Sequence, residues 1–343
     1  MKEHRALVAA VRANCHISDA RHAQGLTLCN YLLAMRELFR WERELAPGEA
    51  PARAEVLRWI GEREALWETV EADEWHALPI SGRSIDPFDV AAANEALACE
   101  GLVYGAARGR FGKPHFFLGA LEAAEVRGGV SVLHVGREYA RDIDAAPAAL
   151  QSSTIVLRRD AFERWLWLKA ETWEAQGGGP MRAALEAYGF AKDRRGALAR
   201  MAGEQRETLI LHELGEHAAG ELLGAPWERL MAETDDRRTE IVLRAARDLL
   251  ADCLVTLPRL AQTGDARGLH FWFATFEGMR RTLFPRLAAA HQAWMSGGSV
   301  EPIHEAARVG RDHWELVALE LAAGGFALAR ERAEAPESIA LDA

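Results

Sequence analysis

Through the first hundred residues, apolar side chains recur at intervals of three and four, which is the spacing of an amphipathic helix. In the stretch 21–44, for example, Leu28, Leu32, Met35 and Phe39 fall on one face. Short stretches with Pro and Gly interrupt this pattern twice. We therefore predict helices over 21–44, 52–75 and 86–99.

The pattern changes between about 102 and 157. Short runs rich in β-branched and aromatic residues follow one another there, with glycines between them. Gly112–Pro114 and Gly128–Gly129 have the composition of hairpin turns. This region predicts a small antiparallel sheet inserted between helical segments.

Helical spacing resumes near Asp160, and Gly177–Pro180 is the clearest break in the second half. Long helices are predicted over 193–223, 235–257 and 300–324, and the tail beyond Leu328 shows no packing pattern. The predicted fold is mainly α, a multi-helix bundle with a small antiparallel β insertion at about 102–157. We expect an N-terminal part at 1–176, a C-terminal helical part at 180–328 and a loose tail at 329–343.

The composition indicates a globular protein without nucleic acid or membrane partners. Of the 343 residues, 49% are hydrophobic, enough for a sizeable core. Asp and Glu outnumber Lys and Arg by 51 to 41, so a polyanion would be repelled. No apolar run reaches the roughly 18 residues that a membrane span needs, and no signal peptide is recognisable.

The four cysteines indicate a reducing compartment. Cys15, Cys29, Cys99 and Cys253 are widely spaced, and none belongs to a C-x-x-C pair. Structural thiols in a cytoplasmic protein are the expectation. The sequence leaves open whether the chain forms a homo-oligomer.

The sharpest chemical pattern is LHELGEH, residues 211–217, within a predicted helix. At about 100° per residue, His212, Glu213, Glu216 and His217 share less than half of the helix circumference. They form two i,i+4 His/Glu pairs, each able to chelate one ion. Imidazole with carboxylate suits zinc, iron or manganese.

The spacing differs from two known helix-borne metal motifs. In the zinc-protease pattern H-E-x-x-H the two histidines are four apart, whereas His212 and His217 are five apart. The E-x-x-H spacing of ferritin-like di-iron bundles is also missing. The alternative interpretation is a surface stripe of i,i+4 salt bridges without a metal.

A second cluster lies in CHISDARH, residues 15–22. If this segment is helical, His16, Asp19 and His22 lie on one face and offer three ligands for iron or zinc. The alternative is that Asp19 or Ser18 caps the following helix and the histidines are incidental. If the two clusters meet, they could hold two metal ions.

Two resemblances rest on these same residues. At CHISDARHAQGLTLCNYLLAMRELFRWE and at LHELGEH, the chain resembles an uncharacterised bacterial protein family of unknown function. In its helix-borne His and carboxylate ligands it is also loosely similar to haem-oxygenase-like di-iron oxidases. The first resemblance implies no activity, and the second implies oxygen chemistry at iron.

The functional prediction is therefore a non-haem metalloenzyme that acts on a small molecule. An iron oxidase or oxygenase is the first choice, with a mono- or dinuclear site. A zinc- or manganese-dependent hydrolase and a non-catalytic helical binding or scaffold protein are the alternatives. The predicted metal ligands are His16, Asp19, His22, His212, Glu213, Glu216 and His217.

Overall fold

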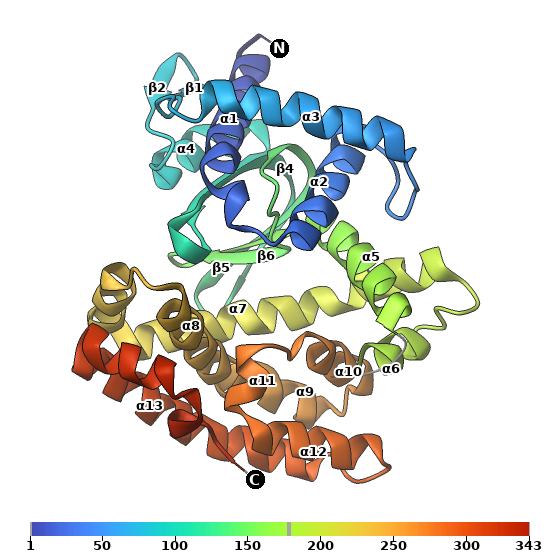
Figure 1. Cartoon of the computed structure of the whole chain (residues 1–343), viewed down its shortest axis with the longest axis vertical. Coiled ribbons are helices and arrows are strands. Elements are labelled where there is room, and N and C mark those ends of the chain that lie inside the picture. The colour runs from blue at the N-terminus through green and yellow to red at the C-terminus, as the bar shows by residue number, and fades with distance from the viewer. Residues whose placement is uncertain (1, 177–179, 343) are drawn as a thin grey trace. The chain divides into compact units, whose positions relative to one another are not determined.

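The chain divides into two compact units. The computed structural model describes residues 2–176 and 180–342. Unit 1 is Met1–Thr172, coloured blue to green in Figure 1, and unit 2 is Trp173–Ala343, coloured from green to red. The break predicted at Gly177–Pro180 falls largely on 177–179, which lie outside the described residues.

The first helices of unit 1 differ from the prediction for 21–44. The helices are α1 (Lys2–His22), α2 (Leu28–Glu42), α3 (Arg53–Val70), α4 (Val90–Leu97) and α5 (Arg159–Gln176), with short 3₁₀ turns η1 (Ala23–Gly25), η2 (Ala98–Glu100) and η3 (Arg110–Gly112). The chain breaks between α1 and α2 because Thr27, in extended conformation, caps α2 by accepting a hydrogen bond from the backbone of Asn30. The helix predicted from residue 21 thus begins at Leu28.

Unit 1 also contains more β structure than the predicted small antiparallel insertion. Five strands form one mixed sheet: β3 (Leu102–Arg108), β4 (Pro114–Arg127), β5 (Val130–Arg141), β6 (Ala148–Gln151) and β7 (Thr154–Arg158). Their order is β3-β4-β5-β7-β6, and β5 pairs with β7 in parallel, whereas the other pairs are antiparallel. The predicted turns at 112–114 and 128–129 are present, but the purely antiparallel prediction is wrong.

A separate hairpin lies before the sheet, where the sequence predicted only a break. Strands β1 (Leu78–Ile80) and β2 (Arg83–Ile85) pair in antiparallel fashion. The two residues between them, Ser81 and Gly82, have φ of 50° and 71°. Two consecutive positive φ angles define the tight turn that fits the twist of a two-residue hairpin.

The core of unit 1 forms where α1 packs on the sheet. α1 contacts β4 and β5, as Figure 1 shows. Leu7, Val11 and Cys15 recur at intervals of four along α1 and are buried against Tyr104 and Phe116 of the sheet. This contact fixes α1, and with it the segment 15–22, against the strands.

The described part of unit 2 is helical throughout. Its elements are α6 (Pro180–Ala187), α7 (Arg194–Glu233), α8 (Arg237–Ala251), the π-helical turn η4 (Asp252–Thr256), α9 (Leu257–Thr263), α10 (Ala266–Thr275), α11 (Met279–Leu283), α12 (Pro285–Met295), α13 (Glu301–Glu334) and the 3₁₀ turn η5 (Pro336–Ile339). The helices predicted to end at 223 and 324 kink there and continue, because Gly224 and Gly325 adopt φ of 56° and 67°. A mainly helical chain is therefore confirmed.

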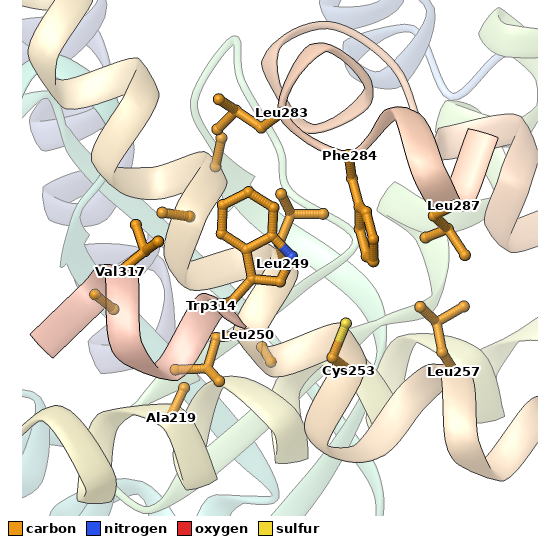
Figure 2. Packing of buried hydrophobic residues seen from close by; sticks show 14 of the residues in the cluster. Ala219, Leu249, Leu250, Cys253, Leu257, Leu283, Phe284, Leu287, Trp314 and Val317 are labelled. Atoms are coloured by element: carbon orange, nitrogen blue, oxygen red, sulfur yellow. The ribbon is translucent and has the colours of Figure 1, made fainter. Parts of the chain in front are cut away.

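Trp314 lies at the centre of the core of unit 2. Its side chain is fully buried among residues that include Leu249, Leu250 and Val317 (Figure 2). Phe284 meets the indole edge to face, with 5.8 Å between ring centroids. Since these residues come from α8, α11–α12 and α13, one apolar cluster holds several helices together.

The tail from 329, predicted to be loose, is part of this core. α13 continues to Glu334, and Ala329 and Ala333 are each 1% exposed. Ile339 is also buried, and the backbone N–H of Leu341 donates to the carbonyl of Leu283. The prediction failed because alanines give little hydrophobic signal, although their small size allows close helix contact.

Across the described ranges 2–176 and 180–342, no helix combines the length and apolar character that spanning a bilayer would require.

Candidate metal site

A close contact between two helices of unit 2 creates the candidate site. A Cβ placed on Gly215 of α7 would lie 2.3 Å from the carbonyl oxygen of Ala251, the last residue of α8. Only a glycine allows the two backbones to approach this closely. As a result, residues 212–216 of α7 face residues 247–252.

Three metal-ligating side chains converge across this contact. His212 and Glu216, one turn apart on α7, and Asp248 on α8 each offer one ligand atom, and these atoms lie within 4.8 Å of one another. One imidazole and two carboxylates are a donor set for divalent ions such as Fe²⁺, Mn²⁺ or Zn²⁺. In the described part of the chain, no other group of three meets this criterion.

A buried carboxylate fixes the orientation of His212. Its Nδ1 lies 2.9 Å from Oδ1 of Asp252, so Nδ1 is the protonated, donating nitrogen. The other ring nitrogen, Nε2, lies 3.6 Å from Oε1 of Glu216. A histidine whose second nitrogen donates to a carboxylate is the usual arrangement of a metal ligand.

Asp252 is in turn held from two further directions. It is fully buried, and it accepts hydrogen bonds from Nε1 of Trp272 at 3.0 Å and from Nη1 of Arg280 at 3.1 Å. It is also the first residue of the π-helical turn η4. Such turns occur often at functional sites, because they displace a side chain from regular helical register.

Glu216 is balanced by a cation from the neighbouring helix. Nη2 of Arg247 donates to Oε2 of Glu216 at 2.8 Å, whereas Oε1 faces His212. Burial opposes ionisation of Glu216, but Arg247 and His212 outweigh it and lower the pKa of Glu216. One oxygen of this carboxylate is therefore directed toward the centre of the group.

The site concentrates negative charge. Burial alone would lower the pKa of His212, but Asp252, Glu216 and Glu213 raise it to about 10. For Asp248, burial and the charge of Glu216 both raise the pKa. A divalent cation would relieve this repulsion and favour the ionised carboxylates.

The two remaining residues of the LHELGEH cluster lie outside the converging group. Glu213 is 7% exposed, and burial together with Glu216 raises its pKa to about 8. His217 turns toward Glu221 instead, with 3.9 Å between Nδ1 and a carboxylate oxygen.

The predicted ligands of unit 1 lie on a helix, as the spacing requires, but they do not converge. His16 contacts Nη1 of Arg63, and burial followed by Arg63 lowers the pKa of His16 to about 4. Asp19 is buried and accepts from Nζ of Lys113 at 2.8 Å and from the backbone of Ile143. Protein cations thus lie beside His16 and Asp19, and among the described residues these two side chains form no metal-ligating group with His22.

The sequence prediction missed Asp248, Asp252, Trp272 and Arg280. The sequence does contain a pattern that could have indicated Asp248 and Asp252, because two aspartates four apart in a helical, apolar stretch lie on one face. For Trp272 and Arg280 the sequence holds no comparable pattern, since both come from other helices.

Comparison with known proteins identifies the family. Residues 6–158 match the N-terminal domain, and residues 163–339 the C-terminal domain, of a family of unknown function (DUF6866). The chain belongs to this family. No curated protein and no solved structure matches it. The family confirms the first resemblance seen in the sequence, whereas the likeness to haem-oxygenase-like oxidases has no counterpart among the matches.

Proposed function

We propose that unit 2 binds one divalent metal ion through His212, Glu216 and Asp248 and uses it to transform a small molecule. The observation that carries this proposal is the contact between Asp252 and His212. It directs Nε2 of the imidazole toward the two carboxylates, and a buried carboxylate in this role is typical of metal sites. A surface salt-bridge stripe would not need a fully buried Asp252.

Iron is the first choice of metal, and oxidation of the substrate the first choice of reaction. Three protein ligands leave coordination positions for other molecules, and iron would supply redox chemistry there. Around the ligands, Arg247 and Arg280 offset the carboxylate charge, and Trp272 stacks on Phe276 behind Asp252. These aromatic rings exclude water from one side of the site.

Hydrolysis at zinc or manganese is the second candidate, and Glu213 favours it. Its carboxyl group is buried beside the ligands and outside the converging group. A non-ligating glutamate next to a metal-bound water is the arrangement used for general-base catalysis.

Elemental analysis of the full chain, purified without a metal-binding tag, tests metal binding directly. We expect about one equivalent of metal in the wild type and its loss in His212→Ala. His217→Ala is the matched control, since it removes a histidine from the same helix outside the group. His16→Ala should also retain the metal.

Two further results separate the alternatives. Iron with substrate-dependent consumption of dioxygen supports the oxidase, whereas zinc or manganese without dioxygen uptake supports the hydrolase. If no stoichiometric metal binds after reconstitution with iron, zinc and manganese in turn, the cluster is a salt-bridge network. The third alternative, a non-catalytic binding or scaffold protein, would then stand.

A further inference from the structure

Unit 1 contains a cavity that the metal site does not involve. Its volume is about 270 Å³, and its wall includes Arg12, Trp41, Glu138, Tyr139, Asp160 and Arg164. These residues come from α1, α2, β5 and α5. We call this cavity the arginine pocket.

Buried guanidinium groups with unmet hydrogen bonds surround the arginine pocket. Arg164, in its wall, has a side chain that is 8% exposed, and its Nη1 has no hydrogen-bond partner within the described chain. Arg141, which lies beside Trp41 of the wall, is 5% exposed at the side chain, and both its Nε and its Nη1 lack a hydrogen-bond partner. Nη2 of Arg158 is also buried and has no hydrogen-bond partner within the described chain. Buried donors without acceptors are costly, so a ligand with acceptor oxygens would be favoured here.

The carboxylates of the pocket do not meet this demand, because each already has a cation of its own. Glu138 accepts from Arg158 at 2.6 Å. Asp160 accepts from Arg164 at 3.2 Å. The other acids in the wall, Glu42 and Glu44, are paired with Arg63 and Arg137, respectively.

Two guanidinium groups, those of Arg12 and Arg141, lie beside Trp41. The guanidinium of Arg12 is 5.8 Å from the indole centroid, and that of Arg141 is 5.7 Å from it. Arg12 uses Nε to bind the carbonyl of Tyr139, which leaves its two Nη groups for a ligand. The nearest carboxylate to Arg141 is Glu138, at 3.5 Å, and this oxygen is outside hydrogen-bonding geometry.

The electrostatics of Arg141 agree with an excess of positive charge. Burial lowers the pKa of Arg141, and the neighbouring Arg158 and Arg164 lower it further, although Glu138 and Asp160 act in the opposite direction. An anion in the pocket would offset this repulsion.

We propose that the arginine pocket binds a small molecule through a carboxylate or phosphate group, held by Arg12 and Arg164 against the ring of Trp41. A guanidinium fork matches the oxygens of either group. The indole and Tyr139 add flat, partly apolar surface for the remainder of the molecule. This site lies wholly in unit 1 and does not depend on the proposed metal chemistry.

Calorimetric titration tests the proposal. The metal-free full chain is titrated with inorganic phosphate and, separately, with benzoate, and sodium chloride keeps the ionic strength constant. We expect saturable binding of at least one probe, weakened about tenfold or more in Arg12→Met, since a charge-assisted contact is lost. Arg5→Met is the matched control, because Arg5 is an exposed arginine of the same helix outside the pocket wall. Phosphate alone would indicate a phosphorylated ligand, and benzoate alone an aromatic carboxylate.

A second variant separates a binding role from a structural one. Arg141→Met removes the buried charge while Glu138 keeps Arg158. The unfolding midpoint of the free variant should equal or exceed that of the wild type, whereas probe affinity should fall. The proposal is overturned if neither probe binds, if Arg12→Met binds as the wild type does, or if Arg141→Met is less stable and binds normally.

Discussion

At the scale of single residues, the proposed metal site depends on a carboxylate that does not belong to the converging group. Asp252 accepts from His212, Trp272 and Arg280, which come from three different helices. Because it has no exposed surface, each of these bonds is made in a low-dielectric environment. Its role is to hold the imidazole in the orientation that a metal ion needs.

Asp252→Asn should weaken metal binding about 10–100-fold while leaving the three ligands in place. An amide has one acceptor oxygen, so it cannot serve His212 and Arg280 as the carboxylate does. Metal titration monitored by calorimetry would measure the change. Asp312→Asn, at an exposed position, is the control. Equal affinities for both variants would contradict the role assigned to Asp252.

In unit 1, the buried pair Lys113–Asp19 predicts a strong effect on stability. Lys113→Met would leave the Asp19 carboxyl group, which is 1% exposed, without its cation. Breaking such a pair costs about 3–5 kcal/mol. In the double variant Lys113→Met with Asp19→Asn, the amide oxygen still accepts from Ile143 and residue 19 no longer carries a charge, so most of the loss should be recovered. Urea unfolding of the wild type, Lys113→Met, Asp19→Asn and the double variant measures this; additive losses would contradict the coupling.

The pair His115–Asp142 predicts a pH dependence of stability. Burial lowers the pKa of His115, but the charge and hydrogen bond of Asp142 outweigh it, so the pKa is raised. Burial would raise the pKa of Asp142, but His115 and Lys113 hold it below its usual range. The histidine contribution is complete below its unfolded pKa of about 6.5 and is lost as pH rises through the folded pKa. The aspartate contribution is complete above about pH 3.9 and is lost as pH falls.

His115→Gln should therefore lower the unfolding midpoint more near pH 5.5 than near pH 9. Differential scanning fluorimetry at several pH values would show it. His304→Gln, at a partly exposed position of α13, should change the midpoint little at either pH. A difference for His115→Gln that is constant across this range would argue against a charged imidazole.

At the scale of elements, the approach of α7 to the end of α8 decides the geometry of the proposed metal site. Gly215→Ala would place a methyl group 2.3 Å from the carbonyl oxygen of Ala251, and the helices would have to separate. We expect a loss of about 1–3 kcal/mol, as for overpacking, together with weaker metal binding, because Asp248 would move away from His212 and Glu216.

Gly220→Ala is the matched control on the same helix. A Cβ at Gly220 meets nothing within 4 Å, so this variant should gain about 0.4–1 kcal/mol by restricting the unfolded chain. Chemical unfolding and metal titration of both variants test the comparison. If Gly215→Ala binds metal as tightly as Gly220→Ala, the site does not depend on this helix contact.

Local pattern predicted some elements well and missed others for identifiable reasons. The helices predicted over 52–75 and 86–99 are present as α3 and α4, because each has a recognisable apolar face. The sequence pattern did not predict α1 as one helix. Its buried face includes the polar residues Asn14, Ser18 and Asp19, which interrupt the apolar periodicity. The parallel pairing of β5 with β7 depends on contacts across the fold, so no local pattern could predict it.

The candidate site shows the same limit. His212 and Glu216 could be paired from sequence, because an i,i+4 spacing fixes their relation. Asp248 joins them only through the packing of α7 on α8. The spacing of His16, Asp19 and His22 was equally suggestive, but Arg63 from α3 and Lys113 beside β4 neutralise that cluster, and neither contact follows from spacing.

At the scale of the whole molecule, two of the buried apolar clusters among the described residues each draw on one unit. The cluster around Trp314 contains residues of unit 2, and the cluster of α1 with the sheet contains residues of unit 1. Each unit therefore has a core of its own, as an independently folding domain would.

Trp314→Ala should destabilise unit 2 by about 3–5 kcal/mol, the usual cost of removing a large buried side chain. Hydrogen exchange measured by mass spectrometry should become faster in α7, α8 and α13, with exchange in α1 and β4 unchanged. Leu316→Ala, which removes a side chain that is 58% exposed in the same helix, is the control. Equally faster exchange in α1 and β4 would show that the two cores unfold as one.

The position of β7 has a consequence for the growing polypeptide. β7 is the last of the described strands to be synthesised, yet it lies inside the sheet, between β5 and β6. Until residues 154–158 emerge from the ribosome, the edge of β5 at residues 131–135 has no partner strand. β6 cannot join the sheet before then either, because it pairs with β7. Open strand edges are where nascent chains associate wrongly. A pause in translation after β5 has emerged and before residues 154–158 have done so would thus expose an unpaired edge, and translation speed over that interval bears on the yield of folded protein.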